Sequence, residues 1–323
     1  MKKKTIAIVT GGFSEERIIS LKSAKFVEDN LDKEKYKSRR IIIDLDKWYE
    51  EDSGVQIDKN DFSLQIGADK ITFDFAFLII HGPPVENGLI QGYFDLLGIP
   101  YSTCDTFTSA LCFNKQATKN YLKPFGIPMV DSILFTNNEQ PTQEDIKRLG
   151  FPIFVKPNNH GSSFGISKVK NLGELKVACE KAYAFDNEIL IEQYMEGREF
   201  SCGVVKKSGK TTALPVTEII SETEFFDFAA KYEHKSQEIT PAKITKEQSD
   251  ICRKSAARIY DLLSCRGMAR VDFILHNGIF KILEVNTVPG LSPESIIPAQ
   301  VKAMGWSYEE FLEELVEGVK MKE

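Results

Sequence analysis

The segment GMARVDFILHNGIFKILEVNTVPG constrains the fold more than any other part of this 323-residue chain. Apolar and polar residues alternate along both of its halves, which is typical of two β-strands with one buried face. The apolar positions of that face are Val271, Phe273, Leu275, Leu283 and Val285. We therefore expect an antiparallel hairpin in a sheet with one face on a core.

The polar positions of the same hairpin gather on its opposite face. They are Arg270, Asp272, Glu284 and Asn286. All four residues have even numbers. In an antiparallel hairpin they share a face only if each even-numbered residue pairs with another even-numbered residue across the strands. This pairing requires an odd number of residues in the connecting loop. The His-Asn-Gly sequence at 276–278 supplies a three-residue loop with glycine in the left-handed position. Two carboxylates and an amide oxygen at one end of a sheet suit Mg²⁺, and a solvated strand face with Arg270 paired to Glu284 is the alternative.

Length and composition limit the class of protein. A chain of 323 residues predicts two domains, or three small ones. Hydrophobic residues make up 42% and charged residues 27%, as in ordinary soluble globular proteins. The formal net charge of −6 lacks the basic character of proteins that coat nucleic acids or bind anionic membranes, so we expect neither partner.

Cysteines and apolar runs indicate the compartment. The six cysteines form no C-x-x-C pair, which predicts buried, reduced thiols rather than a zinc site or a disulfide framework. The longest apolar runs, such as Phe75 to Ile80, have the length of a strand and not of a membrane span. These observations predict a cytoplasmic protein.

The first hundred residues alternate strand-like apolar runs with helical patterns, which is typical of a small parallel α/β domain. Residues 5–9 predict a strand and residues 15–30 a helix. Helices are also expected over Leu89 to Leu97, ending at Gly98, and from about 114 to 125, with a domain boundary between about 100 and 130. Farther on, the irregular segment 219–243 is long for a connection within a compact domain, and such loops are commonly functional lids.

A lysine and a loop of small residues form a candidate phosphate site. Lys156 ends the strand-like run IFVKP, and the loop that follows contains Gly161, Ser162 and Ser163. Glycine backbones and serine hydroxyls donate hydrogen bonds to phosphates, and the lysine supplies charge. The spacing is not that of a P-loop, so a plain hairpin tip is the alternative. Lys115 is either a second phosphate contact or an exposed helix lysine.

Two further residues follow strands at the same edge of the first sheet. Glu16 suits a substrate ammonium group, although an acidic residue in the first turn of a helix is also favourable in itself. His81 directly follows the run 75–80, and a lone histidine is more often structural than catalytic.

Taken in order, these clusters resemble the ATP-grasp ligases, and among them the D-alanine:D-alanine ligase family. The resemblance spans residues 11 to about 298 and is carried by GGFSEERIIS, HGPPVENGLIQGYFDLLGIPY, FVKPNNHGSSFGISKV, IEQYMEGREF, FFDFAAKY, GMARVDFIL and LEVNTVPGLSPES. It implies an α/β, three-domain ATP-grasp fold: a Rossmann-like parallel-sheet domain plus two α+β domains that sandwich ATP. The implied ranges are 1–105 for the substrate-binding domain, 106–195 for the central domain with its phosphate-covering loop, and 196–323 for the domain with the lid and the metal site.

The resemblance also implies an activity. A member of this family joins two D-alanine molecules through an acyl phosphate, releases ADP and phosphate, and serves peptidoglycan synthesis. It uses ATP and two Mg²⁺ ions, with Mn²⁺ as a substitute, and forms a homodimer. An ATP-grasp ligase for other amino acids and a non-catalytic nucleotide-binding protein on the same scaffold are the alternatives.

Carried over position by position, the resemblance assigns residues to ATP and metal. Lys115 and Lys156 contact the phosphates, and Ser162 and Ser163 lie in the loop that closes over them. The nucleotide contacts are completed by Glu192, Gln193 and Tyr194 at the adenine, Glu199 at the ribose, and Lys231. The metal ligands are Asp272, Glu284 and Asn286.

The amino-acid side is assigned in the same way. Glu16 holds the ammonium group of the first substrate, and His81 lies near that substrate's carboxylate. Arg270 and the backbone at Gly290 form the oxyanion site, while Ser295 binds the carboxylate of the second amino acid. The catalytic group is completed by the lid residues Lys231 and Tyr232, and Tyr232 is linked by hydrogen bonds to Ser162 and Glu16.

The chain departs from the family pattern at three places. Val85 stands where glycine is usual, which bears on the turn geometry and on the role of Glu86. Phe226 and Phe228 stand where tyrosines are common and remove two hydroxyls from the lid.

Overall fold

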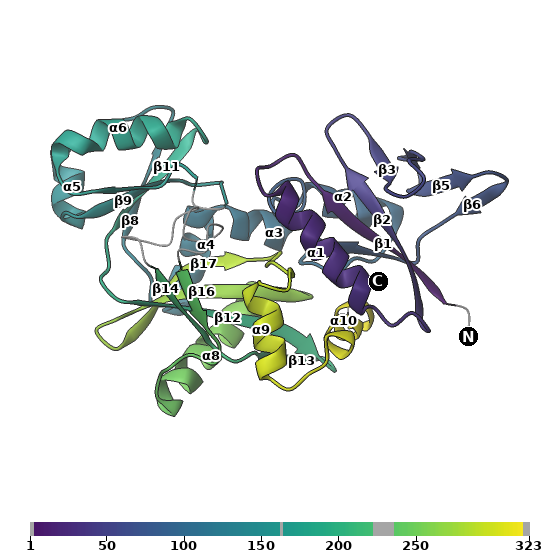
Figure 1. Cartoon of the computed structure of the whole chain (residues 1–323). Helices are drawn as coiled ribbons and strands as arrows, with labels where there is room; N and C mark the ends of the chain where they lie inside the picture. Colours follow the sequence, from purple (N-terminus) through teal and green to yellow (C-terminus); the bar gives the residue numbers. More distant parts are fainter. Residues whose placement is uncertain (1–2, 162–163, 222–235, 319–323) are drawn as a thin grey trace.

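The computed structural model describes residues 3–161, 164–221 and 236–318. Within these ranges, each third of the chain builds one larger sheet, and a small three-stranded sheet accompanies the first (Figure 1). The same part of the chain contains no helix that is both long and apolar enough to cross a membrane. The predicted domain ranges 1–105, 106–195 and 196–323 stay a prediction.

The N-terminal sheet has the strand order β3-β2-β1-β7, with β1 parallel to both β2 and β7. Its core strand β1 is buried because the run Ile6 to Val9 is apolar on both faces, as in parallel sheets covered on both sides. The elements are β1 (Lys4–Gly11), α1 (Arg17–Asn30), β2 (Tyr36–Ile43), β3 (Trp48–Glu50), β7 (Phe75–Leu78) and α2 (Leu89–Leu97). The accompanying small sheet consists of β4 (Ile57–Asp58), β5 (Ser63–Ile66) and β6 (Asp69–Ile71).

The central sheet is antiparallel, in the order β10-β9-β11-β8, and carries two helices. Its elements are β8 (Ser132–Thr136), α5 (Gln143–Leu149), β9 (Ile153–Pro157), β10 (Ser167–Val169), α6 (Leu172–Tyr183) and β11 (Glu188–Gln193). It has a core of its own, formed by residues such as Ile153, Val155 and Ile189.

The C-terminal sheet runs in the order β15-β14-β12-β16-β17, and β13 pairs with β12. Its strands are β12 (Arg198–Lys207), β13 (Lys210–Ala213), β14 (Thr217–Ser221), β15 (Ser236–Ile239), β16 (Met268–His276) and β17 (Ile279–Asn286). The helices are α8 (Lys246–Leu262), α9 (Ile296–Ala303) and α10 (Tyr308–Glu317). The segment 219–243, expected to be irregular, thus contains strands near both of its ends, and residues 222–235 lie outside the described ranges.

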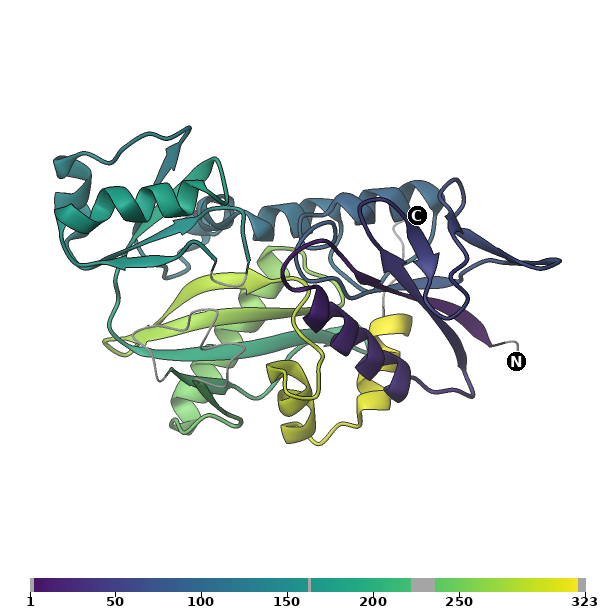
Figure 2. The same cartoon turned by 45° about the horizontal axis from the view of Figure 1, so that its top comes forward.

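Helices α3 (Thr106–Phe113) and α4 (Lys115–Leu122) connect the first two sheets, followed by the 3₁₀ turn η1 (Lys123–Phe125). Figure 2 shows this helical run along the top of the molecule. The sequence predicted one helix from about 114. The break between α3 and α4 is at Asn114, whose side chain accepts a hydrogen bond from the Ala117 backbone and so caps a new helix.

The C-terminal hairpin has the predicted faces but not the predicted loop. Its turn has two residues, Asn277 and Gly278, with φ of 49° and 77°, so that His276 pairs with Ile279. Asn-Gly is the preferred sequence for a tight hairpin turn with two left-handed residues. The expectation of a three-residue loop at 276–278 is therefore wrong.

A β-bulge, and not a three-residue loop, brings the polar residues of both strands onto one face. Phe273 pairs with Ile282, whereas Asp272 pairs with Glu284, so Leu283 is the extra residue. Leu283 is consequently not on the apolar face where the sequence placed it. It packs with Ile274 in a small separate cluster, and Ile282 takes its place in the C-terminal core.

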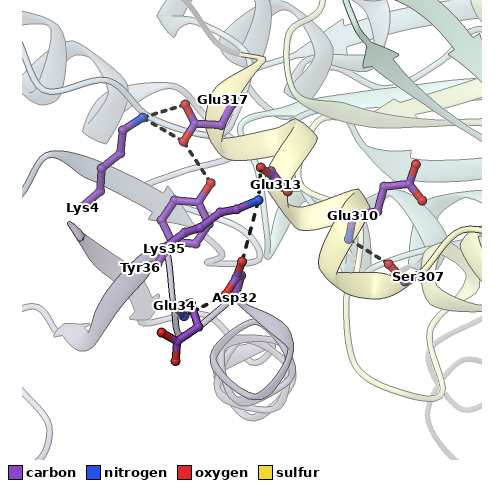
Figure 3. Close-up of polar contacts among 9 residues, drawn as sticks. All are labelled: Lys4, Asp32, Glu34, Lys35, Tyr36, Ser307, Glu310, Glu313 and Glu317. Atoms are coloured by element: carbon purple, nitrogen blue, oxygen red, sulfur yellow. Dashed lines mark hydrogen bonds and ion pairs between the residues drawn. The ribbon is translucent and has the colours of Figure 1, made fainter. Parts of the chain in front are cut away.

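Helix α10 packs against the N-terminal domain. Four of its apolar residues join the core of that domain: Phe311, Leu312, Leu315 and Val316. Around them, Glu317 accepts hydrogen bonds from Lys4 (2.6 Å) and from the Tyr36 hydroxyl (2.9 Å), and Lys35 donates to Glu313 (2.6 Å), as Figure 3 shows. The first and last parts of the chain therefore share one core.

This shared core is expected to depend on apolar contacts rather than on its ion pairs. Leu315→Ala should lower the free energy of unfolding by about 2–5 kcal/mol, because it leaves a cavity at a fully buried position. Glu313→Gln should cost less than about 1 kcal/mol, because the Lys35–Glu313 pair is exposed to water. Urea unfolding followed by tryptophan fluorescence measures both, since Trp48 and Trp306 pack against this core. Equal losses in the two variants would contradict the argument.

Candidate active site

A cavity of about 530 Å³ lies where the three parts of the chain meet. Its walls include Glu16, His81 and Glu86 from the N-terminal domain, Lys115, His160 and Gly161 from the middle of the chain, and Arg270, Glu284, Asn286, Gly290 and Ser295 from the C-terminal part. All but Glu86 and His160 belong to the candidate sites that the sequence predicted. The cavity is thus assembled from segments that are far apart along the chain.

The polar face of the hairpin forms the floor of this cavity, which Arg270, Glu284 and Asn286 line; Asp272 lies on the same face but is not among the lining residues. Because the bulge pairs Asp272 with Glu284 and Arg270 with Asn286, all four side chains lie on one face. Arg270 donates to both carboxylate oxygens of Asp272, at 2.9 Å and 2.7 Å, and Asn286 Nδ2 donates to the same carboxylate at 2.9 Å. Ser201 adds a further hydrogen bond to Asp272 from β12. The predicted alternative, Arg270 paired across the strands with Glu284, is not the pairing observed.

His81 links the N-terminal domain to the loop that follows the hairpin. Its Nδ1 lies 3.0 Å from the Val288 carbonyl oxygen, and its Nε2 lies 3.3 Å from Ser23 Oγ. Since a carbonyl only accepts, Nδ1 carries the proton and Nε2 accepts from the Ser23 hydroxyl. Burial lowers the pKa of His81, which keeps the ring neutral. Ser23 Oγ in turn accepts from the Leu291 backbone at 3.2 Å, so two hydrogen bonds hold the 288–291 loop.

Glu16 and Glu86 face the loop after β9. A Cβ atom placed on Gly161 would lie 3.1 Å from Glu16 Oε2 and 3.8 Å from Glu86 Oε2, so both carboxylates approach this glycine. Burial, followed by the charge of Glu16, raises the pKa of Glu86 to about 8. Val85 is fully buried in the N-terminal core and its φ is not positive, so valine fits the turn where glycine is usual.

Gly290 and Ser295 lie together at the C-terminal wall. A Cβ atom on Gly290 would be only 2.7 Å from Ser295 Oγ, so a side chain there would displace the hydroxyl. Ser295 precedes α9, and its hydroxyl lies 2.9 Å from that of Ser292. This arrangement leaves the backbone at 290 open to the cavity.

The predicted phosphate lysines occupy different positions. Lys115 lines the cavity and donates to the His160 carbonyl oxygen at 2.6 Å. Lys156 is instead buried beside Glu192, with 2.5 Å between its Nζ and Glu192 Oε2. The second partner of Glu192 is Lys119, a buried lysine on α4. Sequence reasoning missed Lys119 because a lysine in a polar helical pattern is normally exposed.

The other predicted nucleotide residues that the structure describes are not among the residues lining the cavity. Gln193 ends β11 and Tyr194 follows it, and their backbone nitrogens donate to the carbonyl oxygens of Asp131 (3.0 Å) and Pro152 (3.2 Å). Glu199 lies on β12. The predicted residues Ser162, Ser163, Lys231 and Tyr232, and the lid departures Phe226 and Phe228, are outside the described ranges.

The described ranges contain no cluster of three or more histidine, cysteine, aspartate or glutamate side chains that would hold a metal ion. The predicted metal ligands Asp272, Glu284 and Asn286 include only two side chains of these types, because the third is an amide. All three lie on the polar face of the hairpin. All six cysteines are buried and free, as predicted.

Comparison with known proteins agrees with this arrangement. The family described as D-ala D-ala ligase N-terminus matches residues 5–104, and the one described as D-ala D-ala ligase C-terminus matches residues 121–317. The D-alanine--D-alanine ligase of Flavobacterium johnsoniae is 48% identical over 97% of this chain and 98% of its own. That of Phocaeicola vulgatus is 43% identical over 98% of this chain and 99% of its own.

Solved structures are equally similar over the full length. The D-alanyl-alanine synthetase A of Vibrio cholerae has a TM-score of 0.89 at 30% identity and covers 98% of both chains. The VanG D-Ala:D-Ser ligase of Enterococcus faecalis has a TM-score of 0.87 at 33% identity, covering 97% of this chain and 98% of its own. The D-alanine--D-alanine ligase of Bacillus anthracis complexed with ATP has a TM-score of 0.79 at 30% identity, covering 98% of this chain and 96% of its own.

The fold and the cavity define a class: this is an ATP-grasp enzyme, a ligase that depends on ATP, as the resemblance of its motifs predicted. Within that class the chain belongs to the D-alanine–D-alanine ligase family, which matches it from end to end.

The raised pKa of Glu86 predicts how stability depends on pH. The folded protein keeps this carboxyl protonated up to about pH 8, whereas its ordinary pKa is 4.5. Between these values the folded state binds the extra proton, so the free energy of unfolding falls as the pH rises. In Glu86→Gln the side chain cannot ionise, so the free energy of unfolding of this variant lacks this decrease with pH. At pH 8 the variant should therefore be the more stable protein by about 4 kcal/mol, because each pH unit between 4.5 and about 8 corresponds to about 1.4 kcal/mol.

Thermal unfolding of wild type and Glu86→Gln at pH 4.5 and pH 8 measures the difference, with pH 4.5 as the internal control. The two proteins should agree more closely at pH 4.5. A variant that is less stable than wild type at pH 8 would show that the carboxylate, not the acid, is the favoured form.

Proposed function

We propose that this chain joins two D-alanine molecules into D-alanyl-D-alanine with ATP, releasing ADP and phosphate, for the synthesis of peptidoglycan precursors. The observation that carries the proposal is the cavity itself. It brings a carboxylate suited to an ammonium group, Glu16, within one space with Arg270 and the phosphate-site lysine Lys115. Full-length similarity to D-alanine–D-alanine ligases supports the same substrates.

The chemistry requires activation of a carboxylate, because a carboxylate is a poor electrophile. A carboxylate oxygen of the first D-alanine attacks the γ-phosphorus of ATP. An O–P bond forms, the bond to the β-phosphate oxygen breaks, and ADP leaves. The amine of the second D-alanine then attacks the carbonyl carbon of this acyl phosphate. Loss of a proton from the nitrogen and departure of phosphate complete the peptide bond.

Residues of this chain stabilise each charge that develops. Arg270 and the backbone at Gly290 face the carbonyl oxygen as it becomes an oxyanion, and preorganised donors of this kind are a large catalytic term. Glu16 holds the first ammonium group, and His81, which lines the cavity and donates to the Val288 carbonyl oxygen, lies near the carboxylate of the same substrate. Ser295 receives the carboxylate of the second D-alanine.

We propose that the hairpin floor holds two Mg²⁺ ions, with Mn²⁺ as a substitute. Its donors are hard oxygens on directly paired residues, Asp272 opposite Glu284, with Asn286 beside them. Magnesium commonly takes only one or two protein carboxylates and completes its coordination with waters and substrate phosphates. When bound, it neutralises phosphate charge during transfer.

The remaining assignments follow the family pattern. Lys115, Lys156, Ser162 and Ser163 hold the phosphates, and Lys231 and Tyr232 close the cavity against water, which would hydrolyse the acyl phosphate. The nucleoside is contacted by Glu192, Gln193, Tyr194 and Glu199. We further propose that the protein is cytoplasmic and works as a homodimer.

Phosphate release from Mg-ATP with D-alanine, D-serine, L-alanine and D-lactate in parallel tests this function, with products identified by mass. We expect release with D-alanine alone and a product with the mass of the dipeptide. D-Serine is included because the similar VanG protein is a D-Ala:D-Ser ligase. Mixtures of D-alanine with each of the other three compounds distinguish acceptors from donors. Release that needs D-serine or D-lactate beside D-alanine would overturn the proposed acceptor.

Glu284→Gln tests the metal site in the same assay. It preserves the size of the side chain and removes one charge from the metal site, so turnover should fall at least about a hundredfold. Turnover close to that of wild type at limiting Mg²⁺ would contradict the metal assignment.

A further inference from the structure

A buried triad of charges lies beside the cavity. Lys119 and Lys156 approach the two carboxylate oxygens of Glu192 from opposite sides: Lys119 at Oε1, and Lys156 at Oε2 with a separation of 2.5 Å. Lys119 Nζ also donates to the Val130 carbonyl oxygen at 3.0 Å. The three side chains are only 5–11% exposed. The triad therefore joins α4 to β9 and β11, on which Lys156 and Glu192 lie.

The triad has two cations for one anion. Burial alone would raise the pKa of Glu192, but the charges of Lys119 and Lys156 hold it at about 2, so the carboxylate is ionised. Burial lowers the pKa of Lys119, and the charge of the Glu192 carboxylate opposes this shift. With both lysines charged, the triad carries a net charge of +1. Without Lys119, the remaining pair of Lys156 and Glu192 would be neutral.

Lys119 lies close to the phosphate side of the active site without lining its main cavity. It faces a second, much smaller cavity of about 10 Å³, whose walls include Lys115 and Glu284. Both of these residues also line the main cavity. Lys119 is therefore next to residues that line the main cavity but does not itself line that cavity.

We propose that Lys119 is a positioning residue for the nucleotide: it neutralises Glu192, and so leaves the positive charge of Lys156 available to the ATP phosphates. The inference rests on the proposed function in that it takes ATP as the nucleotide and Lys156 as a phosphate contact. It adds Lys119, which is not among the predicted site residues, to the residues that phosphate binding requires. A lysine that contacts phosphate and is buried against a carboxylate needs a second cation to keep its charge effective.

The proposal predicts a selective effect on phosphate recognition. Lys119→Met should weaken binding of Mg-ADP more than binding of adenosine, because the lost charge acts on phosphates and not on the nucleoside. A unit charge even about 12 Å away, at an effective dielectric constant of about 20, changes affinity about tenfold. We therefore expect the ratio of Mg-ADP affinity to adenosine affinity to fall about tenfold. A merely structural role would weaken both ligands alike and leave the ratio unchanged.

Two variants isolate charge from structure. Lys119→Arg keeps the charge and should keep the ratio within about threefold of wild type. The double variant Lys119→Met/Glu192→Gln again has a net charge of +1 on Lys156, so the ratio should return toward the wild-type value even if both affinities drop. Lys123→Met removes an exposed lysine just after α4, and is the control for the change in total charge.

Isothermal titration calorimetry with Mg-ADP and adenosine measures the ratio, and thermal unfolding confirms that each variant is folded. Removing one partner of a buried ion pair is strongly destabilising. If Lys119→Met does not fold, the same step is measured in the Glu192→Gln background, where it should again lower the ratio about tenfold. An unchanged ratio in a folded variant overturns the proposal. Because no D-alanine is present, this outcome is independent of the turnover assay that tests the ligase activity.

Discussion

The pairing of Asp272 with Glu284 across the C-terminal hairpin is the constraint on which the site depends. A two-residue turn alone would place Asp272 opposite Leu283, and Glu284 would then lie on the apolar face. The bulge at Leu283 removes this conflict and puts Arg270, Asp272, Glu284 and Asn286 on one face. Arg270 and Asn286 then complete the hydrogen bonding of the buried Asp272 carboxylate, which would be costly to leave unpaired.

The site also requires that the polar face of the hairpin is held in place against the N-terminal domain. Helix α10 contributes four buried side chains to the N-terminal core, and the 288–291 loop is held by His81 and Ser23. Glu16 at the start of α1 and Gly290 beyond β17 therefore face the same cavity. A substrate that spans the cavity would contact both ends of the chain at once.

Much of this arrangement could be predicted from the sequence, because it depends on local patterns. The strands around Val9 and Val155, the helix over 89–97 and the faces of the final hairpin follow from periodicity and turn residues. What escaped prediction depends on tertiary contacts. The bulge arises because one residue too many separates the turn from Glu284, and either a longer turn or a bulge satisfies that count. Lys119 escaped because only the folded structure brings Glu192 to it.

The central claim is that the hairpin floor serves phosphoryl transfer to a carboxylate. D-Alanine labelled with ¹⁸O in both carboxylate oxygens tests this claim most directly, with the released phosphate analysed by mass spectrometry. If the carboxylate is phosphorylated, each peptide bond formed transfers one labelled oxygen to inorganic phosphate, and we expect one ¹⁸O per phosphate. Phosphate without label would contradict the account, because the oxygen would then leave by a route that does not pass through an acyl phosphate.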